Sequence, residues 1–567
     1  MRKFAVVAWL LVIVAGCSPA VSVTPTVGTN TVESVVAPAA VSETPDFYPS
    51  LTPVPSTDMP SSATGITMST LSPTVDLVIE PTLALSTPQP VDSVTAESTI
   101  QPTFQPTVLP TALPVASLTV ESTALPTAPP SSASPAVWEQ DITLNTYGWQ
   151  DALVPTEPND PAYPYPRLDF DAVTGPVPRV YRAVFIQNAY VQLVVVPELG
   201  GRLLRWTDRA TGRQLLYANP VIKPTRWGYR GWWLATGGIE WAFPTEEHGL
   251  NEYRPWQYEL LWNGVRVWDT DDRTGMGVEV TIRLDGAHNS FALIPRITNL
   301  TAQPHAYQFW ANAMLTLSDD ADKLHPADEL HPADKLHPNV PSPDLTFILP
   351  DDAVTVHATD DGSLPGPGGQ MAWPVHGGRD FSRYSEWHKY LGIFAHPARA
   401  GFVGAYDLGN DQGIVRVFPH TTATGVKLFC LGDLSSSLWT EDGSRYFELW
   451  AGLTPTFWDH WTLQPGASVT WTEYWYPVSG IGGYNWANAE AAIRLLHSGD
   501  EAAVAVATSR ALNGTVVLRR GGGEVQRWDV SIAPGRPFRA SGGPAPGGGD
   551  WGVQVLESGT VVAQMGP

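Results

Sequence analysis

Cysteine and basic residues are scarce in this chain. Of its 567 residues two are cysteines, Cys17 and Cys430, so no disulfide framework supports the fold. Lysine and arginine number 33 against 56 aspartates and glutamates, which gives a formal net charge of −23. The electrostatic field of a chain with this negative charge repels nucleic-acid backbones and anionic bilayer surfaces. We therefore expect neutral or cationic ligands and no nucleic acid.

Amphipathic helical patterning is scarce as well. From residue 137 onward, apolar residues form short and often alternating runs separated by Gly, Asp and Asn, which is typical of β-strands. The predicted strands are Arg179–Pro197 (two runs around Asn188), Arg202–Trp206, Trp256–Trp262, Val278–Leu284, Phe291–Thr298, His305–Leu317, Leu391–Phe394, Val403–Tyr406, Ile414–Phe418, Val426–Leu431, Tyr446–Leu453 and Ser468–Tyr476. We predict an all-β fold built as a large antiparallel sandwich rather than repeated βαβ units, with Cys430 as a small buried hydrophobe.

The first 17 residues have the pattern of an export signal. Arg2 and Lys3 precede the apolar run Phe4–Val14, which is too short to span a bilayer permanently. Residues Val14–Cys17 resemble a bacterial lipobox, in which cleavage leaves an N-terminal Cys17 that carries the lipid. The alternative is a plain signal peptide with a chance cysteine. Lipidation predicts a lipoprotein anchored in the cell membrane through Cys17 and facing outside the cytoplasm.

Residues 18–136 form a segment rich in Pro, Thr, Ser, Val and Ala, and no Lys or Arg occurs between Lys3 and Arg167. A segment with frequent proline and few aromatics cannot bury a core, so we predict a disordered tether. All but one of the 23 tryptophans lie from Trp138 onward, which marks the start of the folded region. The predicted domains are a signal peptide (1–17), a linker (18–136), a large β-domain (137–480) and a small β-domain (481–567).

The C-terminal segment has a different composition from the large domain. After the glycine-rich turn Ser479–Gly483 it is richer in Ala, Gly, Val and Arg. We predict a short helix at Ala487–His497, followed by strands at Ala502–Ala507, Thr515–Arg519, Glu524–Ile532 and Gly552–Ala563 joined by glycine-rich turns. This pattern favours a small immunoglobulin-like β-sandwich, and we find no catalytic motif in it.

Three tandem six-residue units, ADKLHPADELHPADKLHP, occupy Ala321–Pro338. Their three histidines at a spacing of six resemble a metal-binding pattern. Each is followed by proline in an extended chain, however, so consecutive histidines lie far apart. We therefore favour a repeat expansion in a surface loop, and we assign no metal ligand and no cofactor.

The stretch Trp227–Trp256 combines several tryptophans with His248 and neighbouring carboxylates. Glycines at 237–238 and prolines at 244 and 255 predict that most of it is loop. Trp and Tyr stack on the apolar faces of sugar rings, while Glu, His, Arg and Asn hydrogen-bond to hydroxyls. The alternative is that these tryptophans fill the core. Because Glu246, Glu247 and Glu252 lie so near His248 in the sequence, we favour a ligand site.

Three segments together resemble the galactose mutarotase-like superfamily of β-supersandwich proteins. They are VVVPELGGRLLRWTDRATGRQLLY (Val194–Tyr217), HGLNEYRPW (His248–Trp256) and RYFELWAGL (Arg445–Leu453). The elements GGIEWAFP and KLFCLGD further resemble an uncharacterised bacterial domain of that superfamily, often found beside tetratricopeptide repeats. The resemblance covers roughly Asn145–Pro477 and implies a groove on the concave sheet that binds sugars.

In the active epimerases of this superfamily, a His protonates the ring oxygen and a Glu removes the anomeric hydroxyl proton. The resemblance places His248 and Glu448 at matching positions. The superfamily's second His is absent, because Gln308, Trp310 and Asn312 stand in that strand, and neutral side chains cannot donate a proton as imidazolium does. We therefore favour sugar binding over mutarotation.

The resemblance also bears on the ligand. The hexose-phosphate branch has an Arg where this chain has Glu252, which would repel a phosphate. We predict a neutral carbohydrate held by Trp232, Trp233, Glu240, Glu252, Trp256, Trp310 and Asn312, with His248 and Glu448 at the catalytic positions. Without the resemblance, Glu448 is as readily a solvent-exposed carboxylate on an edge strand, and Glu240 a partner of Arg226 or Arg230.

Three other functions stay open at this point. One is an epimerase with Glu448 as base and His248 as acid. Another is a glycoside hydrolase, which needs two facing carboxylates and for which Glu240 and Glu448 are the pair we would propose. The last is a surface scaffold that binds other proteins.

Overall fold

The computed structural model describes residues 134–245, 248–317, 340–395, 398–545 and 548–567. The predicted signal peptide with Cys17, the linker up to residue 133, Glu246 and Glu247, and the repeat Ala321–Pro338 lie outside the described residues. Within these ranges, no helix is long and apolar enough to cross a bilayer. The same ranges contain no group of three or more His, Cys, Asp or Glu side chains arranged to hold a metal ion.

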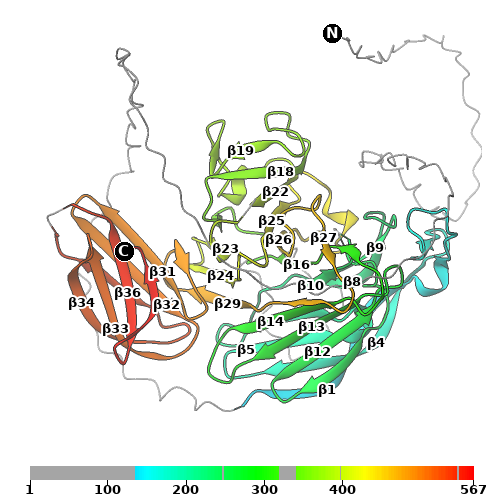
Figure 1. The fold of residues 1–567 in the computed structure, drawn as a ribbon, viewed down its shortest axis with the longest axis horizontal. Coiled ribbons are helices and arrows are strands. Elements are labelled where there is room, and N and C mark those ends of the chain that lie inside the picture. Colours follow the sequence, from blue (N-terminus) through cyan, green and yellow to red (C-terminus); the bar gives the residue numbers. More distant parts are fainter. Residues whose placement is uncertain (1–133, 246–247, 318–339, 396–397, 546–547) are drawn as a thin grey trace, which may run out of the picture. The chain divides into compact units, whose positions relative to one another are not determined.

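The larger of two main sheets has fourteen strands (Figure 1). They are β1 (Ala136–Gly148), β4 (Thr174–Gln187), β5 (Val191–Val196), β6 (Arg202–Asp208), β7 (Arg213–Gln214), β8 (Ala218–Thr225), β9 (Trp233–Gly237), β10 (Ile239–Ala242), β16 (Trp310–Leu315), β18 (Ala353–Thr359), β19 (Gln370–Ala372), β22 (Leu391–Ala395), β25 (Gly425–Cys430) and β26 (Phe447–Gly452). Their order is β19-β18-β22-β25-β26-β16-β10-β6-β5-β4-β1-β8-β9, with β7 beside β6. Strands β10 and β26, which are far apart in the sequence, thus both pair with β16.

The second main sheet has nine strands. They are β11 (Gln257–Leu261), β12 (Gly264–Thr270), β13 (Gly277–Leu284), β14 (Phe291–Thr298), β17 (Leu345–Ile348), β23 (Phe402–Asp407), β24 (Gln412–Val417), β28 (Ser468–Thr470) and β29 (Glu473–Ser479). Their order is β11-β12-β13-β14-β29-β24-β23-β17, with β28 beside β14. Three two-stranded sheets complete this domain: β2 (Leu153–Val154) with β3 (Arg167–Leu168), β15 (His305–Tyr307) with β27 (Trp461–Leu463), and β20 (Val375–His376) with β21 (Arg379–Asp380). The all-β prediction is confirmed.

One face of the fourteen-stranded sheet packs against the nine-stranded sheet. Side chains of a strand alternate between the two faces of a sheet. Ile239 of β10 and Leu449 of β26 therefore enter a core that they share with Val280 of β13. The intervening residues Glu240 and Glu448 lie on the opposite face. We call this opposite face of the fourteen-stranded sheet the distal face.

The prediction that most of Trp227–Trp256 is loop is confirmed for the described residues outside 233–242, but it missed two strands. Strands β9 and β10 fill residues 233–242, and the glycine pair at 237–238 makes the connection between them. Both glycines have positive φ (76° and 77°), and a Cβ atom would meet the carbonyl oxygen of Tyr217 at 2.2 Å or that of Leu203 at 2.5 Å. The glycine pair, which by itself indicates loop, therefore makes the tight connection between two strands.

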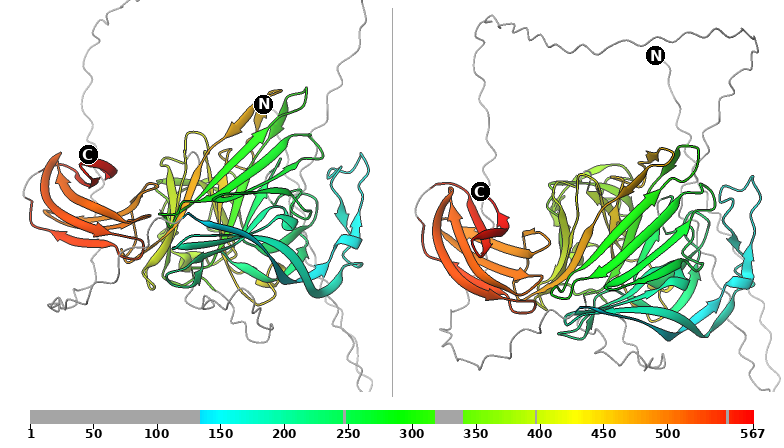
Figure 2. Two further views of the ribbon diagram at one scale, coloured as in Figure 1. Left: turned by 90° about the horizontal axis from the view of Figure 1, so that it is seen from below. Right: turned by 60° about the horizontal axis from the view of Figure 1, so that its bottom comes forward.

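The C-terminal domain is a sandwich of two four-stranded sheets, drawn orange to red in Figure 2. One sheet has the order β30 (Trp486–Ala487), β31 (Ala491–Ser498), β32 (Glu501–Thr508) and β35 (Phe538–Gly542); the other has β34 (Gly523–Ile532), β33 (Leu512–Arg520), β36 (Trp551–Glu557) and β37 (Thr560–Met565). The predicted helix at Ala487–His497 is wrong. Ile493 and Leu495 point into the core of the sandwich while Leu496 is exposed, which is the alternation of a strand.

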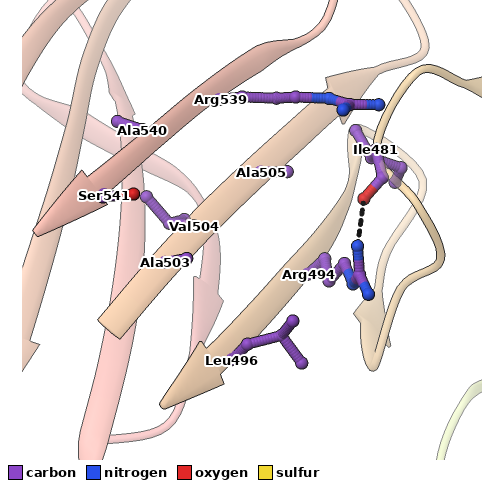
Figure 3. Close-up of a pocket in the computed structure, with 9 residues that line it drawn as sticks. All are labelled: Ile481, Arg494, Leu496, Ala503, Val504, Ala505, Arg539, Ala540 and Ser541. Carbon is purple, nitrogen blue, oxygen red and sulfur yellow. Dashed lines mark hydrogen bonds between the residues drawn. The ribbon is translucent and has the colours of Figure 1, made fainter. Parts of the chain in front are cut away.

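A groove of about 320 Å³ lies on the outer face of β31, β32 and β35 (Figure 3). Its floor is formed by small apolar residues, and Arg494 and Arg539 lie at one end. Arg494 donates to the carbonyl oxygen of Ile481 (3.3 Å), and Arg539 pairs with Asp411. No carboxylate, histidine or cysteine lines this groove, so it lacks a general acid or base.

Candidate functional site

Glu240 is the centre of a buried polar cluster on the distal face. It lies on β10 opposite Asn312 of β16 and is 1 % exposed. Its Oε1 accepts a hydrogen bond from Asn312 Nδ2 (3.0 Å) and lies 2.7 Å from Nδ1 of His248. Its Oε2 accepts from Nη2 of Arg202 (3.0 Å), which belongs to β6. Both oxygens are engaged by protein groups, so Glu240 positions its neighbours.

The charges beside Glu240 keep it ionised. Burial alone would raise the pKa of this carboxyl, but His248 and Arg202 outweigh burial and lower the pKa to about 2. An ionised carboxylate can only accept hydrogen bonds, so Nδ1 of His248 is the donor. A carboxylate that stays ionised above pH 2 cannot serve as a general acid, so in the glycoside hydrolase alternative Glu240 would have to be the nucleophile or base and Glu448 the acid.

The imidazole of His248 is also fixed by aromatic rings. It stacks on Trp233 of β9 with 3.8 Å between ring centroids and 2° between planes. Trp450 of β26 is a further aromatic neighbour, with its ring centroid 5.8 Å away. The His248 side chain is 8 % exposed. A hydrogen bond and a stacking contact thus hold this imidazole in one orientation at the base of the site.

Glu448 is also a neighbour of Trp450. It belongs to β26, which is flanked by β25 and β16, and it is 5 % exposed. Its Oε2 accepts a hydrogen bond from Nε1 of Trp450 (2.7 Å). Burial raises the pKa of Glu448, although Lys427 and His248 act in the opposite direction. The alternative of a solvent-exposed carboxylate on an edge strand is wrong.

Lys427 is a site residue that the sequence analysis missed. It lies on β25 opposite Trp450 and is 4 % exposed. Its Nζ is 4.5 Å from the ring centroid of Trp450, 4.6 Å from that of Phe457 and 5.3 Å from that of Phe429. These are cation–π distances. A single lysine inside the apolar run KLFCL was the available signal, since a buried lysine requires a partner.

Two of the predicted ligand-binding tryptophans, Trp232 and Trp256, lie elsewhere. Trp232 precedes Trp233 and points to the opposite face, where its Nε1 donates to the carbonyl of Pro166 (3.0 Å). Trp256 is in the core between the main sheets and donates to the carbonyl of Asn251 (3.3 Å). Their prediction as ligand contacts is wrong, because neighbouring strand residues face opposite sides and because Trp256 lies behind the sheet.

Glu252 lies near Glu240 and Arg202 but has partners of its own. Its carboxylate is buried and pairs with Arg230, and Oε1 also accepts from the backbone N–H of Leu234 (3.2 Å). Burial raises the pKa of Glu252, and Arg230 opposes that shift. The contact of Glu252 with a ligand stays a prediction, and in this structure its carboxylate is engaged by Arg230 and the Leu234 N–H. Arg230 is therefore not the partner of Glu240, which pairs with Arg202 instead.

Trp310 and Asn312 lie on the distal face but are fully buried. The ring of Trp310 covers Gly452, where a Cβ atom would meet it at 2.4 Å, and packs edge-to-face on Phe457 at 4.8 Å. Asn312 holds Glu240, while its Oδ1 is buried without a hydrogen-bond partner among the described residues. Trp310 supports the floor of the site rather than its surface. Trp233 and Asn312 likewise act through His248 and Glu240.

A family model described as Domain of unknown function (DUF5107) matches residues 157–478. The chain belongs to this family. The solved structures that it resembles include a TPR-domain containing protein from Parabacteroides distasonis ATCC 8503, at 24 % identity and a TM-score of 0.50. That match covers 61 % of this chain and 55 % of that one, so this chain spans about half the length of that relative.

The DUF5107 domain also has the predicted resemblance to galactose mutarotase-like proteins. One is a galactose mutarotase related enzyme from Lactobacillus acidophilus (12 % identity, TM-score 0.35, covering 52 % of this chain and 97 % of that one). Another is a putative aldose 1-epimerase from Escherichia coli K12 (12 % identity, TM-score 0.34, 52 % and 98 %). These likenesses concern the fold. The activity of this domain has to be argued from its own residues.

Glu448 makes a part of the stability of the DUF5107 domain pH-dependent. Its pKa in the folded chain lies above the ordinary value of 4.5. The folded state therefore keeps this proton at a pH where the unfolded chain has released it. Relative to Glu448→Gln, the wild type should lose stability as the pH rises from 4.5 through the folded-state pKa, and the difference should be constant below 4.5. Urea unfolding of both proteins across this range measures it. A difference that stays flat or increases with pH would contradict the assignment.

Proposed function

We propose that the distal face of the DUF5107 domain binds a neutral carbohydrate. The observation that carries this proposal is the placement of His248 and Glu448 beside the same Trp450 ring, each anchored by a hydrogen bond of 2.7 Å. A pyranose has hydroxyls around its rim and C–H groups on its faces, so it fits a surface where polar groups alternate with aromatic rings.

The charges of the cluster support a neutral ligand. Arg202 offsets Glu240 at 3.0 Å, and Lys427 acts on Glu448 as its strongest neighbouring positive charge. The positive charges of this cluster are already offset by its own carboxylates. Little net positive charge is left to attract a phosphate or a carboxylate ligand.

Binding without turnover is the better-supported form of this function. Asn312, a neutral amide, stands in the strand where the mutarotase-like enzymes carry their second histidine. It hydrogen-bonds to Glu240 and cannot deliver a proton as imidazolium does. In this chain, donation of a proton by an imidazolium would therefore depend on His248 alone.

Tryptophan fluorescence and calorimetry of the full chain, titrated with neutral mono- and oligosaccharides, test the proposal. His248→Ala should weaken binding by tenfold or more, an order of magnitude set by the loss of one oriented hydrogen bond in a buried site. The matched control is His305→Ala, because His305 lies on the short sheet of β15 and β27 and contacts Thr301. If His248→Ala binds as well as the wild type, or if no sugar binds, the proposal fails.

An aldose epimerase is the second candidate function. It is favoured by the raised pKa of Glu448, which suits a general base, and by the fixed imidazole of His248, which suits a general acid. Glu448 would take the anomeric hydroxyl proton while His248 protonates the ring oxygen, so that the ring opens and closes on either face. NMR of freshly dissolved α-glucose and α-galactose would then show accelerated anomer exchange, lost in Glu448→Gln. A protein that binds sugar without acceleration excludes this candidate.

We further propose that the chain is a lipoprotein held at the outer face of a cell membrane through Cys17, on the basis of the lipobox-like sequence. Metabolic labelling with a radioactive fatty acid should mark the wild type but not Cys17→Ser, which should leave the membrane fraction. The remaining alternative, a scaffold for other proteins, would require saturable protein binding that sugars do not compete.

A further inference from the structure

We propose that the ligand is an oligosaccharide and that Trp458 and His357 form a second sugar subsite beside the one at His248 and Glu448. This inference rests on the proposed function, because it takes sugar binding at the first subsite as given. It assigns a role to two residues that the sequence analysis did not select.

Trp458 is presented to solvent by a well-ordered loop. The residue is 50 % exposed, so its indole face is accessible to a ligand. Thr456 and Asp459 fix the loop: Asp459 accepts hydrogen bonds from the backbone N–H (3.1 Å) and hydroxyl (2.7 Å) of Thr456, and Trp458 N–H donates to that hydroxyl (3.1 Å). The exposed indole is therefore held in place before any ligand arrives.

Gln308 anchors the same loop from the sheet side. Its Nε2 donates to the carbonyls of Phe457 (2.8 Å) and Asp459 (2.7 Å), the residues on either side of Trp458. Gln308 is fully buried, so these bonds form in a dry environment where they are strong. This contact explains why a polar residue occupies a buried position just before β16.

A continuous set of aromatic contacts joins Trp458 to the first subsite. The ring centroids of Trp450 and Phe457 are 5.2 Å apart, and those of Phe457 and Phe394 are also 5.2 Å apart. The centroids of Phe394 and Trp458 are 5.4 Å apart. Lys427 Nζ contacts the ring of Phe457 at 4.6 Å. Buried rings thus connect the exposed indole to the pair of His248 and Glu448, so the two places belong to one packed aromatic cluster.

His357 supplies a polar group beside this exposed ring. It belongs to β18, and its ring centroid is 6.1 Å from Trp458 and 5.1 Å from Phe457. Burial, with a smaller effect from Lys427, lowers its pKa well below the ordinary value, so the imidazole is neutral. Neither ring nitrogen hydrogen-bonds to another of the described residues. A neutral imidazole can donate to or accept from a sugar hydroxyl, which matches the charge balance of the first subsite.

A ligand needs at least two sugar residues to occupy both subsites. A single pyranose held between His248 and Glu448 does not extend to the outer indole. A second residue of an oligosaccharide can place its apolar face on Trp458 and a hydroxyl at His357. Occupying both subsites should therefore tighten binding of an oligosaccharide relative to the corresponding methyl monosaccharide.

The test uses the full chain and a set of neutral di- to hexasaccharides of glucose, galactose and mannose. Calorimetry is then done with the tightest binder and its methyl monosaccharide. Trp458→Ala should weaken oligosaccharide binding about tenfold and leave the monosaccharide unchanged, while Trp458→Tyr retains most of the affinity. His357→Ala should weaken the oligosaccharide in the same selective way. Trp262→Ala is the matched control, because Trp262 is 75 % exposed and lies between β11 and β12 of the other sheet.

Two failures can be told apart. If oligosaccharide and monosaccharide bind equally, or Trp458→Ala changes neither, the second subsite is wrong while the proposed function stands. If no sugar binds the wild type, the proposed function fails and the second subsite with it. Thermal unfolding of each variant shows whether it is folded, and His357→Ala tests the subsite if Trp458→Ala does not fold.

Discussion

Replacement of Glu240 by alanine is expected to abolish ligand binding and to lower the free energy of unfolding by about 3–5 kcal/mol. The carboxylate is the shared partner of Arg202, His248 and Asn312, and it is fully buried. Its removal leaves the guanidinium of Arg202 in a dry environment without a counter-charge and frees the imidazole of His248 from its acceptor. Urea unfolding measures the first effect and sugar titration the second.

Glu252→Ala separates the two effects of that substitution. Glu252 is another buried carboxylate of this region, and it pairs with Arg230 rather than with Arg202, His248 or Asn312. Its loss should cost a similar free energy of unfolding for the same reason. Sugar binding, measured well below the melting temperature, should persist in Glu252→Ala and be absent in Glu240→Ala. Equal binding by both variants would mean that Glu240 does not organise the site.

The second large effect is expected in the nine-stranded sheet. Arg416 of β24 donates two hydrogen bonds to Glu473 of β29, at 2.7 and 3.0 Å, and the two residues are 0 % and 2 % exposed. Trp471 Nε1 donates a third bond to the same carboxylate (2.8 Å). Arg416→Ala should therefore reduce the free energy of unfolding by about 3–5 kcal/mol, because it leaves an uncompensated buried charge. Urea unfolding at neutral pH measures it.

The double variant Arg416→Met/Glu473→Leu provides the control. It removes both charges and keeps apolar volume in their place, so it should recover most of the stability that Arg416→Ala loses. A double variant as unstable as Arg416→Ala would contradict this account, since the cost would then come from lost packing rather than from an isolated charge.

Local patterning predicted most strands of this fold. The alternating run Phe291–Thr298 coincides with β14, since one of its faces is buried and the other is not. The prediction of secondary structure failed where the local sequence preference differed from the structure that tertiary packing imposes. The glycine pair at 237–238 indicated loop, yet it joins two strands, and Ala487–His497 has helix-forming residues but packs as a strand. Tertiary packing decided both cases.

The site was less predictable than the fold. The resemblance selected His248 and Glu448, and the structure brings both beside Trp450. Tryptophan richness could not distinguish Trp232 from Trp233, because adjacent strand residues face opposite sides. The partnership of Arg202 with Glu240 depends on the pairing of β6 with β10, which the sequence of either strand does not specify.

The most direct test of the central claim is saturation-transfer difference NMR with methyl α- and β-glycosides of glucose, galactose and mannose. A methyl glycoside cannot interconvert its anomers, so the experiment detects binding independently of any turnover. The account predicts transfer from the wild type and from Glu252→Ala to at least one glycoside, and its loss in Glu240→Ala and His248→Ala. The absence of transfer from the wild type, or equal transfer from all four proteins, would contradict a sugar site on the distal face.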